Sequence, residues 1–422
     1  MQAVESTTAA IEQSIIDTIS GSTDRLIEMS RQLIRAASPN PPGDVTQAAD
    51  VAEKLLVAIL GMEVERVTTA PGIVNLIGRL TATRPGRRLV FNGHLDTFPI
   101  GEDLGWTVPP LDGTVKDGLL FGRGVSDMKG GIATSLLAVQ ALSAHRDSWA
   151  GEIVVTLAGD EETMGSLGTR HLLEHFPHAR GDAMISGDVG SPMVVRFGEK
   201  GLLWVEIEAE GSPAHGAHVH KGVNAIDRLR AALDILKQLE TLEPNEPPMV
   251  AAAILAAKPI SEPLSGAGEA SVLRKVTVNI GTIEGGVSPN LVPTRAVAKV
   301  DIRLPVGLNT TDVEALLRER LAAIPGVQLR VVQKYEPRFT DPSHEIVETV
   351  VQSAQRILGQ RPATNMRVGA SDARLYRMFD VPSVVFGPTP YNMGGPDEHV
   401  RIDELSDVAK VHALAALRFL SA

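Results

Sequence analysis

The chain has 422 residues, a formal net charge of −11 and no cysteine. A chain of this length exceeds what one hydrophobic core usually serves, so the length predicts two domains. The absence of cysteine excludes disulfides, thiolate ligands to zinc and a thiol nucleophile. The basic side chains are dispersed, which argues against a nucleic-acid partner, because a phosphate backbone is bound by clustered lysine and arginine.

The N-terminal segment and the apolar runs bear on localisation. Residues 1–19 are acidic and polar, with isoleucines at helical spacing, and lack the basic start and apolar block of a signal peptide. No run approaches the roughly 18 uninterrupted apolar residues of a membrane span. We therefore expect a cytoplasmic protein without a membrane partner.

Helices and short apolar strands alternate over residues 24–197, and the same pattern returns after residue 339. The expected helices include residues 48–60, 130–142, 344–358 and 408–420, and the expected strands include 88–93, 152–159 and 381–387. Such alternation is typical of a mostly parallel sheet with helices on both faces. We therefore predict one α/β domain formed by residues 1–198 and 336–422.

The pattern changes between residues 199 and 335. Expected strands and helices follow one another there as strand 202–211, helix 224–239, strands 275–286 and 295–305, helix 310–324 and strand 327–335. This order resembles a ferredoxin-like sandwich, so we predict an inserted α+β domain over residues 199–335. The proline-rich stretch 243–268 interrupts the pattern and predicts a loop.

Five acidic or imidazole side chains lie in three blocks in which an apolar run enters a glycine-rich turn. The blocks are "VFNGHLDTFP" with His94 and Asp96, "GRGVSDMKGG" with Asp127, and "VVTLAGDEETMGS" with Glu161 and Glu162. An open α/β sheet presents ligands at its carboxyl edge in this way. The combined oxygen and nitrogen donors predict a catalytic metal site.

Spacing within the blocks predicts a division of roles. His94 and Asp96 are two residues apart at a strand end, so their side chains share a face and one can orient the other as a ligand. Glu161 and Glu162 are adjacent and point in different directions, so one would bind the ion while the other moves a proton. The alternatives are a buried histidine with a hydrogen-bonded aspartate, and a solvated acidic turn.

Three further residues are ambiguous from the sequence alone. Asp127 precedes "MKGG" and could bridge two ions, but "SD" before a helix is more often an N-cap. Asp188 ends another apolar stretch and could supply a further oxygen ligand. An aspartate in a simple turn is nearly as good an explanation. His215 lies in the inserted domain, where a catalytic role requires that domain, or its copy from another subunit, to fold over the metal.

These blocks together resemble the co-catalytic zinc exopeptidase and deacetylase family that includes carboxypeptidase G, aminoacylase, acetylornithine deacetylase and succinyl-diaminopimelate desuccinylase. The resemblance covers nearly the whole chain. It extends to the ordered motifs "AASPNPPGD" (36–44), "SPNLVP" (288–293), "DIRLP" (301–305), "GASDARLY" (369–376) and "GPDEHVRIDEL" (395–405).

The resemblance implies a role for each candidate residue. Metal binding would fall to His94, Asp127, Glu162 and Asp188, with Glu161 as general base and Asp96 as support for His94. His215 of a neighbouring subunit would stabilise the transition-state oxygen. Substrate contacts would come from Asn290 and Arg303, and from the 369–372 loop with Gly369 and Ser371. The inserted domain usually mediates dimerisation in this family and acts as a lid, so the resemblance implies a homodimer.

One position departs from the family pattern. The family places its last metal-binding histidine two residues before the proline of the C-terminal "PDE" block, and that position is Gly394 here. His399 is the nearest imidazole, and a bulged loop would be needed to make it a ligand. Two ions therefore remain an alternative to the single ion that we expect, and Mn, Co or Fe is credible beside Zn in an oxygen-rich site.

The expected reaction is hydrolysis of a carbon–nitrogen bond in a small carboxylate-bearing substrate, such as an N-acyl amino acid or a peptide-like amide, by metal-activated water. The replacement of the family's last metal-binding histidine by Gly394 leaves a second possibility open. This is an aromatic aminohydrolase that releases ammonia, similar to the divergent relative 5-nitroanthranilate aminohydrolase. A third possibility is a catalytically inactive relative that acts as a binding protein.

Overall fold

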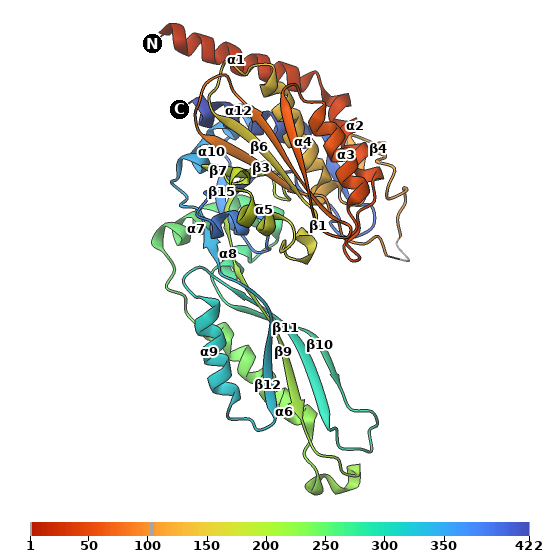
Figure 1. Cartoon of the computed structure of the whole chain (residues 1–422). Coiled ribbons are helices and arrows are strands. Elements are labelled where there is room, and N and C mark those ends of the chain that lie inside the picture. Colours follow the sequence, from red (N-terminus) through yellow and green to blue (C-terminus); the bar gives the residue numbers. More distant parts are fainter. Residues whose placement is uncertain (1, 102–104, 422) are drawn as a thin grey trace.

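A computed structural model describes residues 2–101 and 105–421 of the chain (Figure 1). Its largest feature within these residues is a nine-stranded sheet. In sheet order the strands are β1 (Met62–Ala70), β2 (Ile73–Thr81), β6 (Glu152–Ala158), β3 (Arg88–His94), β7 (Ala183–Ser186), β15 (Ser383–Val385), β8 (Val194–Glu199) and β13 (Arg338–Phe339), with β14 (Ala363–Arg367) also paired to β8.

The large sheet is mixed, whereas the sequence predicted a mostly parallel one. Strands β6, β3, β7 and β15 run parallel in its centre, and β14 is parallel to β8. Antiparallel pairs flank this centre, with β1, β2 and β6 on one side and β15, β8 and β13 on the other. Only Pro71 and Gly72 separate β1 from β2, and so short a connection permits antiparallel pairing alone.

Helices cover both faces of the large sheet. Leu89 and Phe91 of β3 face one hydrophobic core and Val90 faces another, because successive side chains of a strand point to opposite faces. The first core is covered by α1 (Gln2–Ser20), α2 (Thr23–Arg35), α3 (Thr46–Val57), α4 (Gly130–Ser143), α10 (Glu345–Leu358) and α12 (Ile402–Ser421). The second is covered by α5 (Thr169–His175) and α11 (Ala373–Met378).

A separate four-stranded sheet is built from residues 201–335. Its strands pair antiparallel in the order β10 (Thr277–Gly285), β11 (Arg295–Leu304), β9 (Gly201–Glu210) and β12 (Val327–Tyr335). Helices α6 (Ala225–Lys237) and α9 (Thr310–Leu321) pack on it around a core of their own. The strand order is that of a ferredoxin-like sandwich, and the unit extends away from the large sheet (Figure 1).

The proline-rich segment is helical, so the expected loop is wrong. It forms α7 (Pro248–Ser265), which is followed by α8 (Glu269–Leu273). Pro248 lies at the first turn, where a missing N–H costs nothing, but Pro259 and Pro263 lie inside the helix. The buried side chains of α7 fall on one face, which packs on β14: Val250, Ile254, Ala257 and Ser261. Burial of this face outweighs the cost of the internal prolines.

The remaining elements are short. A three-stranded sheet contains β16 (His399–Arg401), β5 (Leu119–Phe121) and β4 (Val115–Lys116). Short helical turns are η1 (Val125–Lys129), η2 (Glu161–Thr163), η3 (Pro177–Ala179), η4 (Gly216–Lys221) and η5 (Gln238–Thr241). Over residues 2–101 and 105–421, we find no helix with the length and apolar character that a membrane crossing requires.

Candidate metal centre

Three of the expected ligands meet at the carboxyl edge of the large sheet. His94 ends β3, Asp127 lies in η1, and Asp188 follows β7. Each offers one ligand atom, and these atoms all lie within 4.8 Å of one another. A site for one divalent ion is therefore formed by segments that are far apart in the sequence.

His94 is held so that one ring nitrogen faces this group. Its Nδ1 lies 2.9 Å from the backbone oxygen of Asp96, and its Nε2 lies 2.9 Å from Oδ1 of Asp127. An Nδ1–H donated to the carbonyl leaves Nε2 of the neutral ring as the ligand atom. Burial opposes a charge on His94, but hydrogen bonds to Asp127 and Asp96 and their negative charges raise its pKa well above the usual value.

Asp96 supports the site differently from the way the sequence suggested. It contacts His94 mainly through its backbone oxygen, since its Oδ1 is 3.5 Å from Nδ1. Its fully buried carboxylate instead accepts hydrogen bonds from the backbone N–H groups of Glu161 at 3.1 Å and Glu162 at 2.9 Å, and from the Asn40 side chain at 2.9 Å. Asp96 thereby ties the end of β3 to the turn that carries both glutamates.

Asp127 is not a helix cap. The N-cap positions of η1 and of the following helix α4 are Gly124 and Lys129, and no side chain of the described residues caps either element. The start of α4 lies against the segment before Asp188, since a Cβ on Gly131 would come within 1.9 Å of the Gly187 oxygen. Glycine at position 131 therefore permits the close approach that brings Asp127 and Asp188 together.

The two adjacent glutamates have different surroundings. Glu161 is buried, with Oε1 3.2 Å from Nη1 of Arg374, so the solvated turn does not describe it. Oε1 of Glu162 is buried and has no hydrogen-bond partner among the described residues. Burial raises the pKa of Glu161 to about 8 and, together with neighbouring carboxylates, raises that of Glu162 to about 10.

These surroundings fit a bound cation. Buried carboxylates that crowd one another hold protons tightly until a positive charge compensates them. An unpaired carboxylate oxygen on Glu162, beside an imidazole and two aspartates, supplies the oxygen and nitrogen donors that zinc and manganese accept. The residues present therefore suit a divalent metal.

Buried arginines surround the centre, and the sequence analysis did not single them out. Arg367 ends β14, with Nη1 3.0 Å from Oδ2 of Asp188. Arg374, which lies in the "GASDARLY" motif, donates to the Ser371 oxygen at 2.5 Å as well as contacting Glu161. No local pattern marks these arginines, because their acidic partners come from distant segments of the chain.

The expected substrate contacts divide between two places: the 369–372 loop lies beside the metal centre, where the Ser371 oxygen accepts from Arg374, and Arg303 lies on the smaller sheet. Ser371 is fully buried and donates both its N–H and its hydroxyl to the Glu199 carboxylate, at 2.6 Å each. Arg377 reaches the same carboxylate at 2.9 Å. Arg303 lies on β11 of the smaller sheet, where its Nε is 2.8 Å from Asp301. Within the expected 369–372 loop, the Ser371 side chain is thus already paired with protein.

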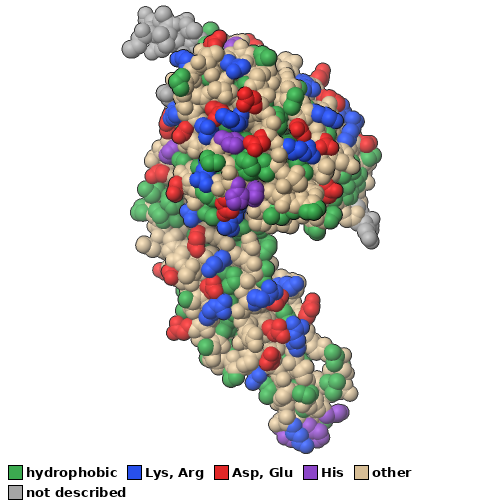
Figure 2. Space-filling view, in the orientation of Figure 1, with side chains coloured by type: hydrophobic (Ala, Val, Ile, Leu, Met, Phe, Trp, Pro, Cys, Tyr) green, Lys and Arg blue, Asp and Glu red, His purple; other side chains and the backbone are tan. Residues whose placement is uncertain are grey.

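His215 and Asn290 lie together, but far from His94. The N–H of Gly216 donates to the Asn290 oxygen at 2.7 Å, and His215 forms a β-bridge with Leu291. This segment is at the end of the smaller unit that points away from the large sheet (Figure 1). Figure 2 shows histidine side chains gathered on this end.

His399 is not brought to the three-ligand group. Its ring stacks on Tyr391 with centroids 5.0 Å apart, and its Nδ1 lies 2.7 Å from the Asp397 oxygen. It lines a different cavity, of about 950 Å³, between α2, β16 and α12. The conformation of the chain therefore does not support His399 as a metal ligand.

The loop that contains Gly394 is fixed by a buried ion pair. Nη1 of Arg123 lies 2.6 Å from Oε2 of Glu398, and Nη2 donates to the Gly394 oxygen at 2.9 Å. Oε1 of Glu398 accepts from the N–H and hydroxyl of Ser126, which directly precedes Asp127. This pair locks the C-terminal "PDE" block against the segment that carries Asp127.

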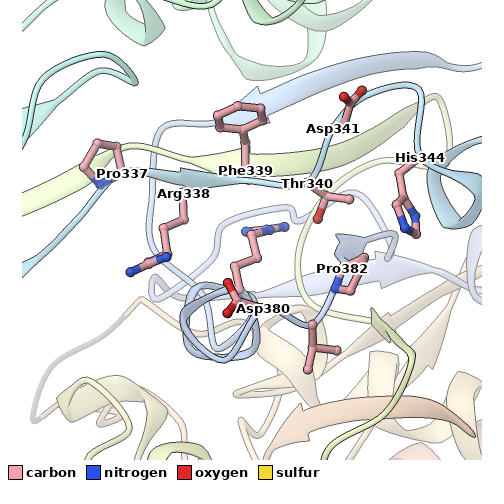
Figure 3. A pocket seen from close by; sticks show the side chains of 10 residues that line it. Pro337, Arg338, Phe339, Thr340, Asp341, His344, Asp380 and Pro382 are labelled. Atoms are coloured by element: carbon pink, nitrogen blue, oxygen red, sulfur yellow. The ribbon is translucent and has the colours of Figure 1, made fainter.

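A cavity of about 360 Å³ lies beside Arg377, where the chain returns from the smaller sheet (Figure 3). Arg338, Asp341, His344 and Asp380 are among its lining residues, and Figure 3 shows them around its rim. None of the three grouped ligands lines it, so this cavity is separate from the metal centre.

Comparisons with known proteins agree with this geometry. Residues 90–418 match the family model described as Peptidase family M20/M25/M40. A succinyl-diaminopimelate desuccinylase from Nitrobacter hamburgensis is 31% identical over 414 residues, which cover 92% of this chain and 97% of that protein.

Two solved structures have the same fold. An M20 family metallo-carboxypeptidase from Sulfolobus solfataricus superposes with a TM-score of 0.77 at 19% identity, covering 93% of this chain and 98% of that one. A dinuclear metal-binding M20 peptidase from Bacillus subtilis gives a TM-score of 0.66 at 15% identity, covering 95% and 99%.

The family match and the desuccinylase relative do not favour aromatic deamination or an inactive binding protein. They agree with a buried group of metal ligands that has a glutamate beside it. The chain is a metal-dependent hydrolase that cleaves carbon–nitrogen bonds, and it belongs to peptidase family M20/M25/M40.

Proposed function

We propose that this hydrolase cleaves the amide bond of a small N-acyl amino acid that carries a free carboxylate. The observation that carries the proposal is the buried group of His94, Asp127 and Asp188 beside Glu161. The desuccinylase relative, by its name, removes a succinyl group from an amino acid, and it covers nearly the whole chain.

In the proposed mechanism, each residue has a distinct task. His94, Asp127 and Asp188 would hold a divalent ion, which when bound would supply Lewis-acid chemistry to the amide and to the attacking water. Glu161 takes the proton from the attacking water and later returns it to the leaving nitrogen. Its carboxylate is buried beside the grouped ligands, where it can reach a water held by the ion. Arg374 orients the Glu161 carboxylate, and Asp96 fixes the backbone of the turn.

We further propose one tightly held ion per site, with zinc or manganese as the metal. A second ion would have Asp127 and Glu162 as oxygen ligands but no imidazole, since Gly394 has no side chain and His399 stacks on Tyr391. Elemental analysis of the dialysed protein is expected to find one metal equivalent. Two equivalents in the unaltered protein would contradict this proposal.

Replacement of Gly394 tests the missing ligand directly. A Cβ at this position would meet only Phe98, at 3.6 Å, so Gly394→His has room, although its φ of 72° costs about 1 kcal/mol or more. We expect the variant to bind a second equivalent of zinc, measured by titration calorimetry. Gly395→His is the matched control, because it places an imidazole one residue away and should leave the stoichiometry unchanged.

We also propose that residues 199–335 form a distinct domain that serves as a lid and joins two copies of the chain. Its separate sheet and core support this division, and α7 and α8 join it to the core of the large sheet. The segment that carries His215 lies at the end of the smaller unit that points away from the large sheet (Figure 1). This arrangement supports a contribution from a second copy, because the same chain would have to fold back to deliver His215.

The substrate proposal is tested with N-acetyl and N-succinyl forms of alanine, leucine, glutamate and lysine. The zinc and manganese forms of the protein are incubated with each compound, and free amino acid and ammonia are measured separately. We expect release of the amino acid without ammonia. Ammonia from 5-nitroanthranilate, with no amide cleavage in the panel, would contradict the proposal.

A further inference from the structure

We infer that Tyr335, the last residue of β12, is a positioning residue for Glu161. The inference rests on the proposed function, because it takes Glu161 as the general base. Tyr335 belongs to the smaller sheet, where it pairs with Leu202 of β9, and it also packs against the second core of the large sheet. One side chain therefore joins the smaller unit to the domain that holds the metal centre.

The hydroxyl of Tyr335 is tied to the turn that carries the two glutamates. It donates to the backbone oxygen of Met164 at 2.9 Å and accepts from Nε2 of Gln333 at 2.8 Å. The N–H of Met164 in turn donates to the backbone oxygen of Glu161 at 2.7 Å. The backbone of Met164 is thus held between Glu161 and a hydroxyl of the smaller sheet.

The conformation of this turn requires support at Met164. This residue ends η2 with φ 81°, in the left-handed region that strains any side chain with a Cβ. At the start of the turn, the Asp96 carboxylate accepts from the N–H groups of Glu161 and Glu162. Asp96 therefore fixes the start of the turn, and Tyr335 holds its strained end.

The ring of Tyr335 lies against the arginine that contacts the base. The guanidinium carbon of Arg374 is 4.7 Å from the ring centroid, a distance at which a cation is attracted to an aromatic face. The Arg374 side chain is only 5% exposed, and its Nη1 lies 3.2 Å from Oε1 of Glu161. Its Nε has no hydrogen-bond partner among the described residues, and its Nη2 has only the Met164 sulfur, at 3.9 Å. The ring therefore helps to hold an arginine that has few hydrogen bonds of its own.

Both contacts of Tyr335 lead to the same carboxylate, one through the backbone of the turn and one through Arg374. A general base has to lie within hydrogen-bond reach of the water that it deprotonates. A displacement of about 1 Å can cost on the order of 100-fold in rate, even when its cause is remote from the reacting atoms. The smaller unit therefore contributes to the position of Glu161, although Glu161 belongs to the other domain.

Two replacements separate the hydroxyl from the ring. Tyr335→Phe removes the contact with Met164 and keeps the ring, whereas Tyr335→Leu removes both. We measure steady-state turnover of the zinc-loaded protein with the compound of the N-acetyl and N-succinyl panel that the unaltered protein cleaves fastest. We expect kcat to fall roughly 10-fold for Tyr335→Phe and about 100-fold for Tyr335→Leu.

KM and zinc content should stay nearly the same in both variants, because Tyr335 contacts neither the substrate nor the ion. Tyr376→Phe is the matched control. It also removes a buried hydroxyl, which lies 2.7 Å from Oγ1 of Thr156 in the second core, and its kcat should be unchanged. An unchanged kcat in Tyr335→Leu would overturn the inference.

Repeating Tyr335→Phe in Glu161→Gln protein separates positioning from a merely structural role. A glutamine cannot accept the proton wherever it lies, so the second change should lower the residual kcat by less than about twofold. An equal loss with and without Glu161 would overturn the inference and leave the proposed function intact. A Glu161→Gln protein that turns over as fast as the unaltered protein would instead overturn the proposed role of Glu161, and the inference with it.

Discussion

At the residue scale, the metal centre is defined by the partner of each carboxylate. Asp96 uses its oxygens for backbone N–H groups, and Asp188 lies against Arg367. Glu162 keeps a buried oxygen that has no hydrogen-bond partner within residues 2–101 and 105–421. A carboxylate that is already saturated by hydrogen bonds holds the framework, whereas an unsaturated one is ready for a ligand. Adjacent or nearly adjacent acids thus have different functions.

Replacement of Glu161 with glutamine is expected to separate catalysis from metal binding. Glutamine keeps the shape of the side chain but cannot accept the proton, so turnover should fall by roughly 100-fold or more. Zinc content, measured by elemental analysis, should stay nearly the same. Glu174→Gln, at an exposed pair with Arg170, should affect neither quantity. Loss of metal from Glu161→Gln would make Glu161 a ligand instead.

The sequence predicted the blocks that carry the candidate metal ligands, but not the residues that contact those ligands. Strand-end positions placed His94 correctly, because an apolar run followed by a turn is a local signal. The pairing of Arg367 with Asp188 joins residues 179 positions apart, and no local pattern encodes it. The orientation of His399 is likewise set by stacking on Tyr391, a contact that spacing alone does not reveal.

At the element scale, α12 carries a buried histidine that makes stability depend on pH. His412 donates through Nε2 to the Phe386 oxygen at 2.8 Å, and its Nδ1 lies 3.2 Å from the Ser135 hydroxyl. Burial lowers its pKa to about 4. Because the folded pKa is below the unfolded value of about 6.5, its stabilisation is complete above that value and is lost as pH falls toward 4.

We therefore expect His412 to reduce the free energy of unfolding by about 2 kcal/mol between about pH 7.5 and pH 5. Urea unfolding at both pH values measures this difference. His412→Gln keeps a donor for the Phe386 oxygen but does not titrate, so its stability should change less over the same interval. An equal pH response in both proteins would contradict the assignment.

Helix α7 illustrates why local signals can mislead at this scale. Its prolines predicted a loop, but its one buried face packs on β14 and the helix persists. Ile254 is 1% exposed and its neighbour Leu255 is 53% exposed. Ile254→Ala should lower the free energy of unfolding by about 2–5 kcal/mol, whereas Leu255→Ala should change it by roughly 0.5 kcal/mol or less. Similar values for both, in urea unfolding, would contradict packing by one face.

Larger patterns in the sequence were more informative than single residues. Alternating helices and strands predicted the parallel centre of the large sheet, and the β–α–β–β–α–β order predicted the strand order of the smaller sheet. The antiparallel edges were missed because β1 and β2 are joined by a tight turn instead of a helix. The length of a connection determines whether two neighbouring strands run parallel or antiparallel. Apolar periodicity carries no information on the length of these connections.

At the scale of the whole molecule, the proposed dimer can be tested by mixing two inactive variants. If His215 acts on the metal centre of the other copy, mixing Glu161→Gln with His215→Ala should restore activity. Each mixed dimer has one site with both an intact Glu161 and an intact His215. Random mixing should therefore give about a quarter of the unaltered turnover.

The same mixture gives no recovery if His215 acts within its own chain, since every site then lacks one of the two residues. Unmixed samples of each variant set the baseline. Capture of the mixture through an affinity tag that only one variant carries confirms that the variants exchange subunits, and an exchanged but inactive mixture would contradict the shared site.

The entry and exit of the smaller unit are side by side. Leu202 of β9 pairs with Tyr335 of β12, and just beyond them Glu199 of β8 pairs with Arg338 of β13. Because the chain departs from the large sheet and rejoins it at one point, the four-stranded sheet can lengthen or shrink without stretching the hydrolytic framework, whereas α7, which packs on β14, has to stay in place. Gene rearrangement can therefore alter the outer sheet while the part of the fold that holds His94, Asp127 and Asp188 is inherited unchanged.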